Sequence, residues 1–350
     1  MKTRVLKIVD LQQDENSILE ASELIKSGEV VAFPTETVYG LGANALDPRA
    51  VEKIFRAKGR PGDNPLIVHV SKTQDVDKLV KELPPKARAL METFWPGPLT
   101  IVFKKSSVIP SEVTAGLNTV AIRMPNHPVA LRLIDYSGLP IAAPSANRSG
   151  HISPTTARHV LEDMDGIIPL ILDGGKCRVG LESTVLDMTS DIPVILRPGG
   201  VTLEMLEGIL GEVRVDLSVL KPVANGQKAR SPGMKYVHYA PRAQVLIVRG
   251  RLDSIVKKIN ELVKEYSASG MKVGVLATQE TRESYHKGEV LVLGERTRPA
   301  VMASNLFSVL REFDAKGVDI VLAEWVDTSN EGLAIMNRMI RAAGFNVIDA

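Results

Sequence analysis

The sequence contains very little cysteine and almost no net charge, and both facts restrict what the chain can be. A single cysteine, Cys177, among 350 residues excludes an intramolecular disulfide and agrees with a reducing compartment. The 43 lysines and arginines nearly balance the 41 aspartates and glutamates, so the formal net charge is only +2. This balance argues against non-specific nucleic-acid binding as the main role, although it allows a local basic patch.

Long apolar runs and targeting signals are missing as well. The apolar runs are short: the stretch from Val318 to Ala323, which is interrupted by Asp319, has the length of a strand and not of a membrane-spanning helix. The first residues, MKTRVLKIVD, lack the hydrophobic segment of a signal peptide. We therefore expect a cytoplasmic protein without membrane association. With 44% apolar and 24% charged residues, the chain can form one large or two ordinary globular domains.

Several familiar site patterns are also absent. There is no G-x-x-x-x-G-K-[ST] pattern, so a nucleotide would not be held by a standard P-loop. Neither C-x-x-C nor H-E-x-x-H occurs, and the six histidines are scattered without zinc-like spacing. Ser145 does not lie in a G-x-S-x-G elbow, which disfavours a serine hydrolase. We therefore predict no dedicated metal site and no nucleophilic triad.

The most informative stretch is residues 30–70, where polar loops alternate with short apolar runs. Pro34-Thr35-Glu36-Thr37 and the basic loop from Lys58 to Pro65 each adjoin a predicted strand. Hydroxyl and carboxyl groups that face cations make a poor core but a suitable small-molecule pocket. A solvated turn beside a surface charge cluster is the alternative. The predicted elements are a strand at Val30–Phe33, a glycine-spaced loop through Gly40 and Gly42, a helix at Pro48–Ala57 capped by Asp47, and a strand at Leu66–Val70.

The rest of residues 1–211 alternates short strand-like and helical runs. This irregular alternation predicts a twisted, mixed α/β sheet in place of a regular doubly wound one. We expect Asn126 and Ser153 to cap helices. Further helices are predicted at residues 16–27, 74–82, 86–94 and 126–136, and strands at residues 99–103, 119–123, 140–143, 167–172, 183–188 and 194–197.

Residues 212–243 change in character, because periodicity fades and proline, glycine and asparagine accumulate as in an interdomain linker. The segment also contains Tyr236 and His238, which a passive spacer does not need. Since long irregular loops are often functional, we expect it to fold as a lid over the pocket of the first domain. An ordinary docked linker is the alternative.

Residues 244–350 follow a pattern of alternating strands and helices that predicts a small Rossmann-like domain. It has no G-x-G-x-x-G fingerprint, so we predict no dinucleotide there. The expected strands are 244–248, 272–277, 289–293 and 319–323, and the expected helices are 252–266, 299–315 and 332–343.

Cations and hydroxyls follow several of the strands predicted in the first domain. Arg123 closes one strand and Arg197 another, and guanidinium groups suit carboxylate or phosphate oxygens. Together with Lys58 and Arg60, they indicate a site for an anion, although each alone is more typical of a surface residue. The full candidate set is Lys58, Arg60, Asn64, Arg123, Ser145, Asn147, Arg148, Ser183 and Arg197.

Six ordered blocks of the sequence resemble the signature of the Sua5/YrdC family, the L-threonylcarbamoyladenylate synthases: PTETVYGLG, KGRPGDNPLIVH, WPGPLT, VAIRMP, APSANRSG and GLESTVLD. SPGMKYVHYAP and AIMNRMIRAAG are similar to the later part of the long, two-domain Sua5 form. The resemblance thus covers the whole chain. It implies a YrdC-like catalytic domain at residues 1–211, a linker or lid at 212–243, and a Rossmann-like Sua5 C-terminal domain at 244–350.

The resemblance also implies a reaction, in which L-threonine, bicarbonate and ATP give L-threonylcarbamoyladenylate and pyrophosphate, the first step of t6A modification of tRNA. It implies Mg²⁺ that enters with ATP, no need for tRNA in this step, and transient contact with the downstream tRNA threonylcarbamoyl-transferase complex. Such chemistry requires positioning and charge neutralisation, with Lys58 and Arg60 as the catalytic residues. The implied L-threonine contacts are Thr35, His69, Arg123 and Ser183, and the implied ATP contacts are Lys58, Arg60, Asn64, Thr114, Ser145, Asn147, Arg197 and Tyr236.

Two other functions are compatible with parts of this pattern. One is an RNA-binding module with a nucleotide-sensing role, which the near-neutral charge and the lack of an aromatic platform disfavour. The other is carbamoyl transfer of the hydrogenase-maturation type, which a related domain performs in proteins that also carry zinc-finger cysteines. The single cysteine of this chain disfavours it.

Overall fold

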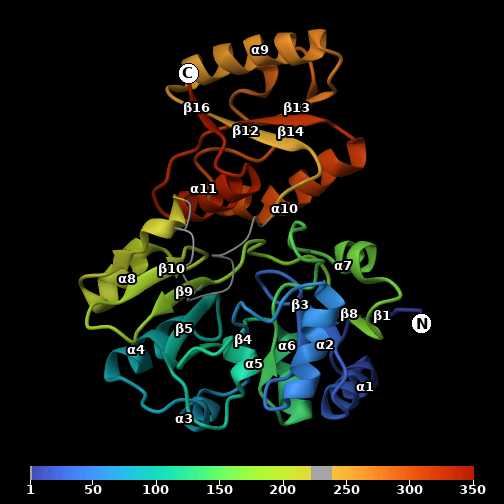
Figure 1. The fold of residues 1–350 in the computed structure, drawn as a ribbon, viewed down its shortest axis with the longest axis vertical. Coiled ribbons are helices and arrows are strands. Elements are labelled where there is room, and N and C mark those ends of the chain that lie inside the picture. Colours follow the sequence, from blue (N-terminus) through green and yellow to red (C-terminus); the bar gives the residue numbers. More distant parts are fainter. Residues whose placement is uncertain (1, 222–238) are drawn as a thin grey trace. The chain divides into compact units, whose positions relative to one another are not determined.

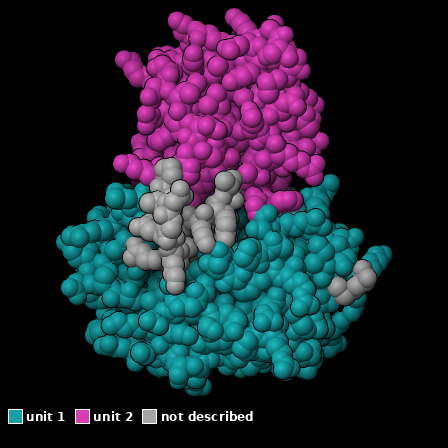
Figure 2. Space-filling view, in the orientation of Figure 1, with its two compact units in different colours: residues 1–149, 153–219, 223–235 teal, residues 150–152, 220–222, 236–350 magenta. Residues whose placement is uncertain are grey.

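The computed structural model describes residues 2–221 and 239–350, which divide into two compact units (Figures 1 and 2). Residues 2–149 and 153–219 belong to the first unit, and residues 150–152, 220–221 and 239–350 to the second. Tyr236 and His238, the key residues of the expected lid, lie outside the described residues. The expected boundaries at residues 211 and 243 therefore stay predictions. No helix in the described residues is both long and apolar enough to span a membrane.

The first unit is built on one mixed sheet, to which its described residues contribute eleven strands. The strands are β1 (Arg4–Lys7), β2 (Val31–Phe33), β3 (Gly40–Asn44), β4 (Ile67–His69), β5 (Leu99–Lys104), β6 (Thr119–Arg123), β7 (Ile141–Ala142), β8 (Leu170–Asp173), β9 (Thr184–Asp187), β10 (Val194–Arg197) and β11 (Arg214–Val215). Their order is β1-β8-β2-β3-β7-β4-β6-β5-β9-β10-β11. β2 is parallel to β8 but antiparallel to β3, and β4 is parallel to β6 but antiparallel to β7.

Apolar side chains cover both faces of this sheet. Val31 and Phe33 of β2 pack with one cluster, whereas Ala32 between them belongs to another. Because successive strand residues point to opposite faces, β2 is buried on both sides. The helices of the unit, seen around the sheet in Figure 1, are α1 (Glu15–Lys26), α2 (Pro48–Lys58), α3 (Val76–Leu79), α4 (Pro85–Phe94), α5 (Ser111–Thr114), α6 (Pro128–Ser137), α7 (Ala157–Met164) and α8 (Leu203–Leu210).

Helix α2 begins as predicted and delivers the basic loop. The Asp47 Oδ1 atom accepts a hydrogen bond from the main-chain N–H of Arg49 at 2.9 Å, and Pro48 occupies the first helical position. The helix ends at Gly59, which has a left-handed φ of 62°. Lys58, its last residue, is buried with 4% exposure, so the basic loop starts inside the unit and not at its surface.

Three local predictions are wrong. Gly40 and Gly42 lie in strand β3, not in a loop, and a Cβ at Gly42 would lie 2.7 Å from both Phe33 and Ile141 side chains. The glycine is therefore explained by close packing. Asn126 is not the cap of α6, because His127 Nδ1 accepts from the Val129 N–H at 3.3 Å.

The third wrong prediction concerns the cap of α7. Thr156 Oγ1 caps this helix by accepting from the His159 N–H at 3.3 Å. Ser153, the predicted cap, donates instead to the buried carboxylate of Glu182 at 2.5 Å. A serine before an amphipathic run can thus serve a tertiary contact, which the local pattern does not distinguish from a cap.

The second unit contains a five-stranded parallel sheet in the order β14-β13-β15-β12-β16. Its strands are β12 (Gln244–Arg249), β13 (Val273–Ala277), β14 (Glu289–Val292), β15 (Ile320–Glu324) and β16 (Val347–Asp349), and its helices are α9 (Leu252–Ala268), α10 (Pro299–Lys316) and α11 (Glu331–Ala342). Helix α9 covers one face, and α10 and α11 cover the other (Figure 1). This arrangement matches the predicted Rossmann-like pattern; β16 was not predicted.

A buried carboxylate lies at the carboxyl end of the central strand, β15. Glu324, the last residue of β15, accepts hydrogen bonds from the hydroxyls of Thr278, Thr281 and Tyr285 and from the guanidinium of Arg296. Its side chain is 1% exposed, so these donors replace the water that it lost on burial. Burial beside this carboxylate also raises the pKa of Tyr285.

Candidate active site

The turn after β2 is stabilised by its own threonine. Thr35 Oγ1 accepts hydrogen bonds from the main-chain N–H groups of Thr37 and Val38, each at 3.2 Å, and donates to the Val38 carbonyl at 2.6 Å. Such a side-chain turn replaces backbone hydrogen bonding where the strand stops. The turn is buried, and it leaves the next side chain, Glu36, directed at another part of the sheet.

Glu36 forms a buried ion pair with Arg123, the last residue of β6. The Arg123 Nη2 atom lies 2.7 Å from Glu36 Oε1, and the two side chains are 4% and 2% exposed. Arg123 also donates from Nε to the Gly97 carbonyl at 3.3 Å. On β4, His69 lies directly opposite Arg123 in the parallel register. Burial and the nearby guanidinium lower the pKa of His69 to about 3, so the imidazole is neutral at physiological pH.

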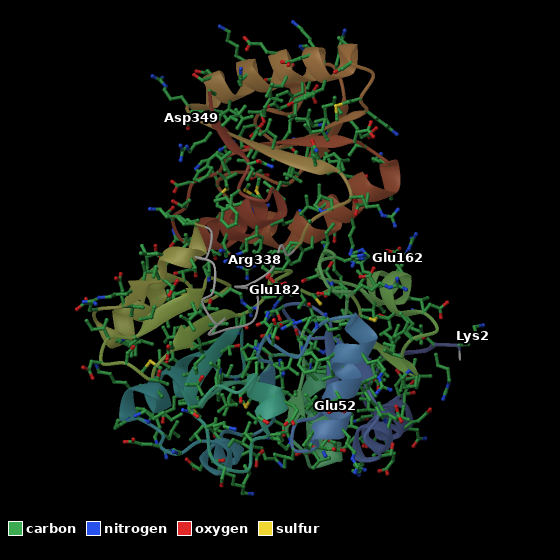
Figure 3. The ribbon with its side chains drawn as sticks, in the orientation of Figure 1. Lys2, Glu52, Glu162, Glu182, Arg338 and Asp349 are labelled. Carbon is green, nitrogen blue, oxygen red and sulfur yellow. The ribbon has the colours of Figure 1, made fainter. Side chains whose placement is uncertain are left out.

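A second group surrounds Lys58. Its Nζ atom donates to the main-chain carbonyls of Ser145 and Asn147, the latter at 2.7 Å. Burial, and next the charge of Arg60, lower the pKa of Lys58 to about 7, while the carboxylates of Asp163 and Glu182 act in the opposite direction. Glu182 is labelled in Figure 3. A buried ammonium that contacts carbonyl groups instead of carboxylates is a ready partner for an anionic ligand.

The basic loop holds Arg60 and Asn64 together. Arg60 Nη2 donates to the Asn64 carbonyl at 3.0 Å, and its guanidinium lies 6.0 Å from the centre of the Phe55 ring. The side-chain amide of Asn64 is fully buried, yet neither its nitrogen nor its oxygen has a hydrogen-bond partner among the described residues. Because a buried amide without partners is costly, the Asn64 side chain offers one donor group and one acceptor to a water or a small molecule at this loop.

The third group joins β9 and β10. Arg197 donates from Nε to the Ser183 carbonyl and from Nη2 to the Ser183 hydroxyl, both at 3.1 Å. The same hydroxyl lies 2.7 Å from Thr100 Oγ1. Gly199 permits this arrangement, since a Cβ there would lie 2.2 Å from the Thr184 nitrogen.

Short strands explain how the groups come together. The strand directions place the turn after β2 and the basic loop before β4 where the strands end on one side of the sheet. Arg123 and Arg197 lie where the strands end on the opposite side. A three-residue strand such as β4 is only about 10 Å long, so long side chains from the two ends of the strands can meet over one face of the sheet. The Glu36–Arg123 ion pair is the direct demonstration.

The remaining candidates take different positions. Thr114 is buried at the end of α5, where its hydroxyl lies 3.4 Å from the Ser111 carbonyl, and the adjacent Val113 carbonyl accepts from the Leu66 N–H. Arg148 is exposed and donates to the Asp163 carbonyl at 3.1 Å. Tyr236 lies outside the described residues. Glu36 was not a candidate residue, and its presence in the quoted PTET turn was the only signal that could have found it.

The buried Cys177 lies near the turn that contains Thr35 and Glu36. Burial raises the pKa of its thiol to about 12, and the main chain of Thr35 and the charges of Glu36 and Arg123 modify that value. The thiol is therefore protonated and unreactive at neutral pH, as expected for a buried cysteine.

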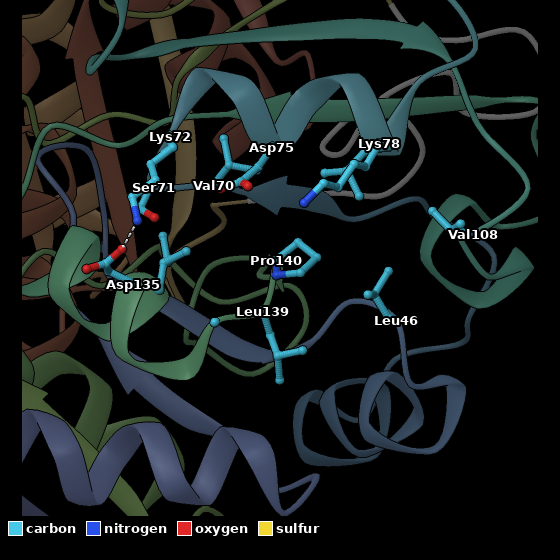
Figure 4. Close-up of a pocket in the computed structure, with 13 residues that line it drawn as sticks. Leu46, Val70, Ser71, Lys72, Asp75, Lys78, Val108, Asp135, Leu139 and Pro140 are labelled. Atoms are coloured by element: carbon cyan, nitrogen blue, oxygen red, sulfur yellow. Dashed lines mark ion pairs between the residues drawn. The ribbon is translucent and has the colours of Figure 1, made fainter.

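A further pocket, with a volume of about 380 Å³, lies elsewhere in the first unit (Figure 4). Apolar residues such as Leu46, Val108 and Leu139 line it, and Lys72 forms an ion pair with Asp135 at 2.5 Å. None of the candidate residues lines this pocket, so it does not belong to the site described above.

Two family models together match most of this chain. The family model described as telomere recombination, Sua5_yciO_yrdC, matches residues 23–199. The model described as threonylcarbamoyl-AMP synthase, C-terminal domain, matches residues 201–344. The chain belongs to the Sua5 family of threonylcarbamoyl-AMP synthases. The predicted family, its two-domain form and the enzyme class are thus confirmed.

Individual members of the Sua5 family agree over nearly the whole chain. The threonylcarbamoyl-AMP synthase of Pyrococcus abyssi is 51% identical over 335 residues, which cover 96% of each chain. That of Bacillus subtilis is 49% identical and covers 97% of this chain and 96% of its own. The structure of P. abyssi Sua5 complexed with L-threonine superposes with a TM-score of 0.94 at 48% identity, covering 99% of this chain and all of that one. The predicted twisted, mixed α/β architecture with its second Rossmann-like domain is confirmed.

Proposed function

We propose that this enzyme combines L-threonine with bicarbonate and activates the product with ATP, releasing threonylcarbamoyl-AMP and pyrophosphate. The observation that carries the proposal is the set of buried cations Lys58, Arg60 and Arg123, together with the buried Asn64, whose side-chain amide has no hydrogen-bond partner in the described residues. The P. abyssi relative described as complexed with L-threonine supports the amino-acid substrate.

The groups near β4 and β6 suit the amino acid. Arg123 supplies a guanidinium for the L-threonine carboxylate. The Nδ1 atom of His69 lies 3.2 Å from the Ile67 carbonyl, and the neutral imidazole offers one donor and one acceptor near the proposed amino-acid site. Thr35 at the turn and Ser183 on the β9 side complete the proposed set.

The groups around Lys58 suit the triphosphate. Lys58 and Arg60 neutralise the charge that develops on phosphoryl oxygens, and the Asn64 amide offers both a donor and an acceptor. The approach of an anion raises the pKa of Lys58 above 7 and holds the ammonium in its charged form. Ser145, Asn147, Thr114, Arg197 and Tyr236 complete the proposed nucleotide set.

The proposed chemistry needs no nucleophile from the protein. The bound L-threonine first gives up its ammonium proton to solvent. The free amine then attacks bicarbonate, with loss of water, and a carbamate oxygen attacks the α-phosphorus as pyrophosphate leaves. The side chains described above hold the amine, the carbamate and the phosphorus in line, and exclusion of water protects the labile carbamate.

We propose that Mg²⁺ accompanies ATP. No cluster of three or more His, Cys, Asp or Glu side chains suited to a metal ion occurs in residues 2–221 and 239–350. A metal held chiefly by phosphate oxygens and water needs few protein ligands, and the buried Glu182 could accept hydrogen bonds from that water. Bound in this way, Mg²⁺ would neutralise phosphate charge. We also propose a cytoplasmic location and transient delivery of the product to the tRNA-modifying complex.

Pyrophosphate release from ATP tests the proposal, with L-threonine and bicarbonate added singly and together and without tRNA. We expect release only when both are present, loss of release with EDTA, and recovery with excess Mg²⁺. Release that does not depend on L-threonine would contradict the proposed reaction. Tight, salt-sensitive tRNA binding without turnover would favour the RNA-binding alternative.

A further inference from the structure

Glu36 carries a buried negative charge that the described residues satisfy only in part. Its Oε1 atom lies 2.7 Å from Arg123 Nη2, but neither carboxylate oxygen has a partner in hydrogen-bonding geometry among the described residues. An ionised carboxylate can accept about four hydrogen bonds, and a buried one without them is costly. Glu324 in the other unit, with four donors, shows how this chain otherwise satisfies a buried glutamate.

Thr35, His127 and Cys177 do not supply a second positive charge to Glu36, and Arg178, whose charge also acts on His127, is exposed to solvent. The Thr35 hydroxyl already donates to the Val38 carbonyl at 2.6 Å. Burial lowers the pKa of His127, so that this imidazole is neutral at pH 7, and the buried Cys177 thiol is only a weak donor. The carboxylate therefore has room in its hydrogen bonding for a cationic group brought by the ligand.

The pair of charges matches one class of small molecule. Arg123 and Glu36 present one positive and one negative group side by side, with no net charge. An α-amino acid carries a carboxylate and an ammonium on the same carbon, so it can place one on each partner. A 2-hydroxy acid carries only the anion, which Arg123 attracts and Glu36 repels.

We infer that Glu36 is a specificity-determining residue that makes this subsite select a zwitterionic α-amino acid over the corresponding 2-hydroxy acid. The inference rests on the proposed function, because it assumes that L-threonine binds between Glu36 and Arg123. It assigns Glu36 a role separate from that of Arg123, which holds the carboxylate common to both kinds of ligand.

Calorimetric titration of the full chain with two ligands tests this inference. One ligand is L-threonine, and the other is 2,3-dihydroxybutanoate of the same configuration, in which a hydroxyl replaces the ammonium. For the wild type we expect at least tenfold tighter binding of L-threonine. A preference below threefold would overturn the inference whether or not any variant folds.

The Glu36→Gln variant separates charge from shape. We expect L-threonine to bind at least tenfold more weakly, while 2,3-dihydroxybutanoate binds as well or better, because Arg123 then has no anionic neighbour. A merely structural role would weaken both ligands by the same factor, and that outcome would contradict us. Glu36→Asp keeps the charge and should keep the preference for L-threonine. Glu324→Gln removes a buried carboxylate from the other unit and should leave the ratio of the two affinities unchanged.

The same titrations distinguish the two proposals. If the wild type binds L-threonine but does not discriminate against the hydroxy acid, only the role of Glu36 fails. If it binds neither ligand, in the presence or absence of ATP, the amino-acid substrate itself is wrong.

Discussion

His69 and Arg123 occupy opposite positions in the parallel register of β4 and β6, so a neutral imidazole lies beside a buried guanidinium. The low pKa of His69, about 3, follows first from burial and then from this neighbour. A histidine that stays neutral over the physiological range can act as a hydrogen-bonding group but not as a cation.

We expect this arrangement to destabilise the protein in acid. The unfolded chain binds a proton at His69 near pH 6.5 and the folded chain only near pH 3, so folding stability falls as the pH drops below 6.5. His69→Asn removes this dependence. Between pH 7 and pH 4.5 the wild type should lose about 2 kcal/mol more of its free energy of unfolding than the variant. Urea titrations at the two pH values measure the difference, and parallel losses would contradict it.

Lys58 should make stability rise with pH in the same direction, but on the alkaline side. Its pKa is about 7 in the folded chain and 10.5 as a free side chain, so the unfolded chain holds more protons between these values. Wild-type stability should therefore rise, relative to Lys58→Met, by about 2 kcal/mol from pH 7.5 to pH 9.5. A constant difference in the free energy of unfolding between the two proteins over this range would show that Lys58 is not held in its neutral form.

Substitution of Arg60 should impair turnover far more than folding. In Arg60→Ala we expect pyrophosphate release to fall by about 100-fold, as for loss of one preorganised charged donor. Arg60→Lys restores the charge without the planar donor pair and should be intermediate. Arg56→Ala, on the exposed side of α2, is the matched control and should have wild-type turnover. Equal turnover in Arg60→Ala and Arg56→Ala would show that Arg60 does not take part in the reaction.

Separate substitutions of Gly199 and Gly208 test the hydrogen bonds between Ser183 and Arg197. A Cβ at Gly199 would collide with the Thr184 nitrogen and the Glu182 carbonyl, so Gly199→Ala should displace Ser183 and Arg197 and raise the KM for ATP. Gly208→Ala in helix α8 meets no atom within 4 Å and should stabilise the protein by about 0.5–1 kcal/mol without changing KM. A normal KM in a folded Gly199→Ala variant would show that Arg197 does not contact the nucleotide.

The sequence allowed prediction of those features that depend on neighbouring residues. Asp47 and Pro48 mark the start of α2, and the strand Val194–Arg197 has the predicted limits. Gly42 and Ser153 were misassigned because their contacts, with Ile141 and Glu182, come from distant segments. The turn with Glu36 was expected to face cations, but its pairing with Arg123 could not be derived for the same reason.

The order of strands in the first unit also bears on how the chain folds during synthesis. β2, which precedes the turn with Thr35 and Glu36, lies between β3 and β8, and β8 is made only at Leu170–Asp173. Arg123, which pairs with Glu36, is likewise translated long after the turn that contains Glu36, and so are β9 and β10. Contacts between such distant segments form slowly and expose unpaired strand edges meanwhile. The turn with Thr35 and Glu36 is therefore synthesised early and reaches its final surroundings late, so a nascent chain should depend on chaperones until about residue 197 has left the ribosome.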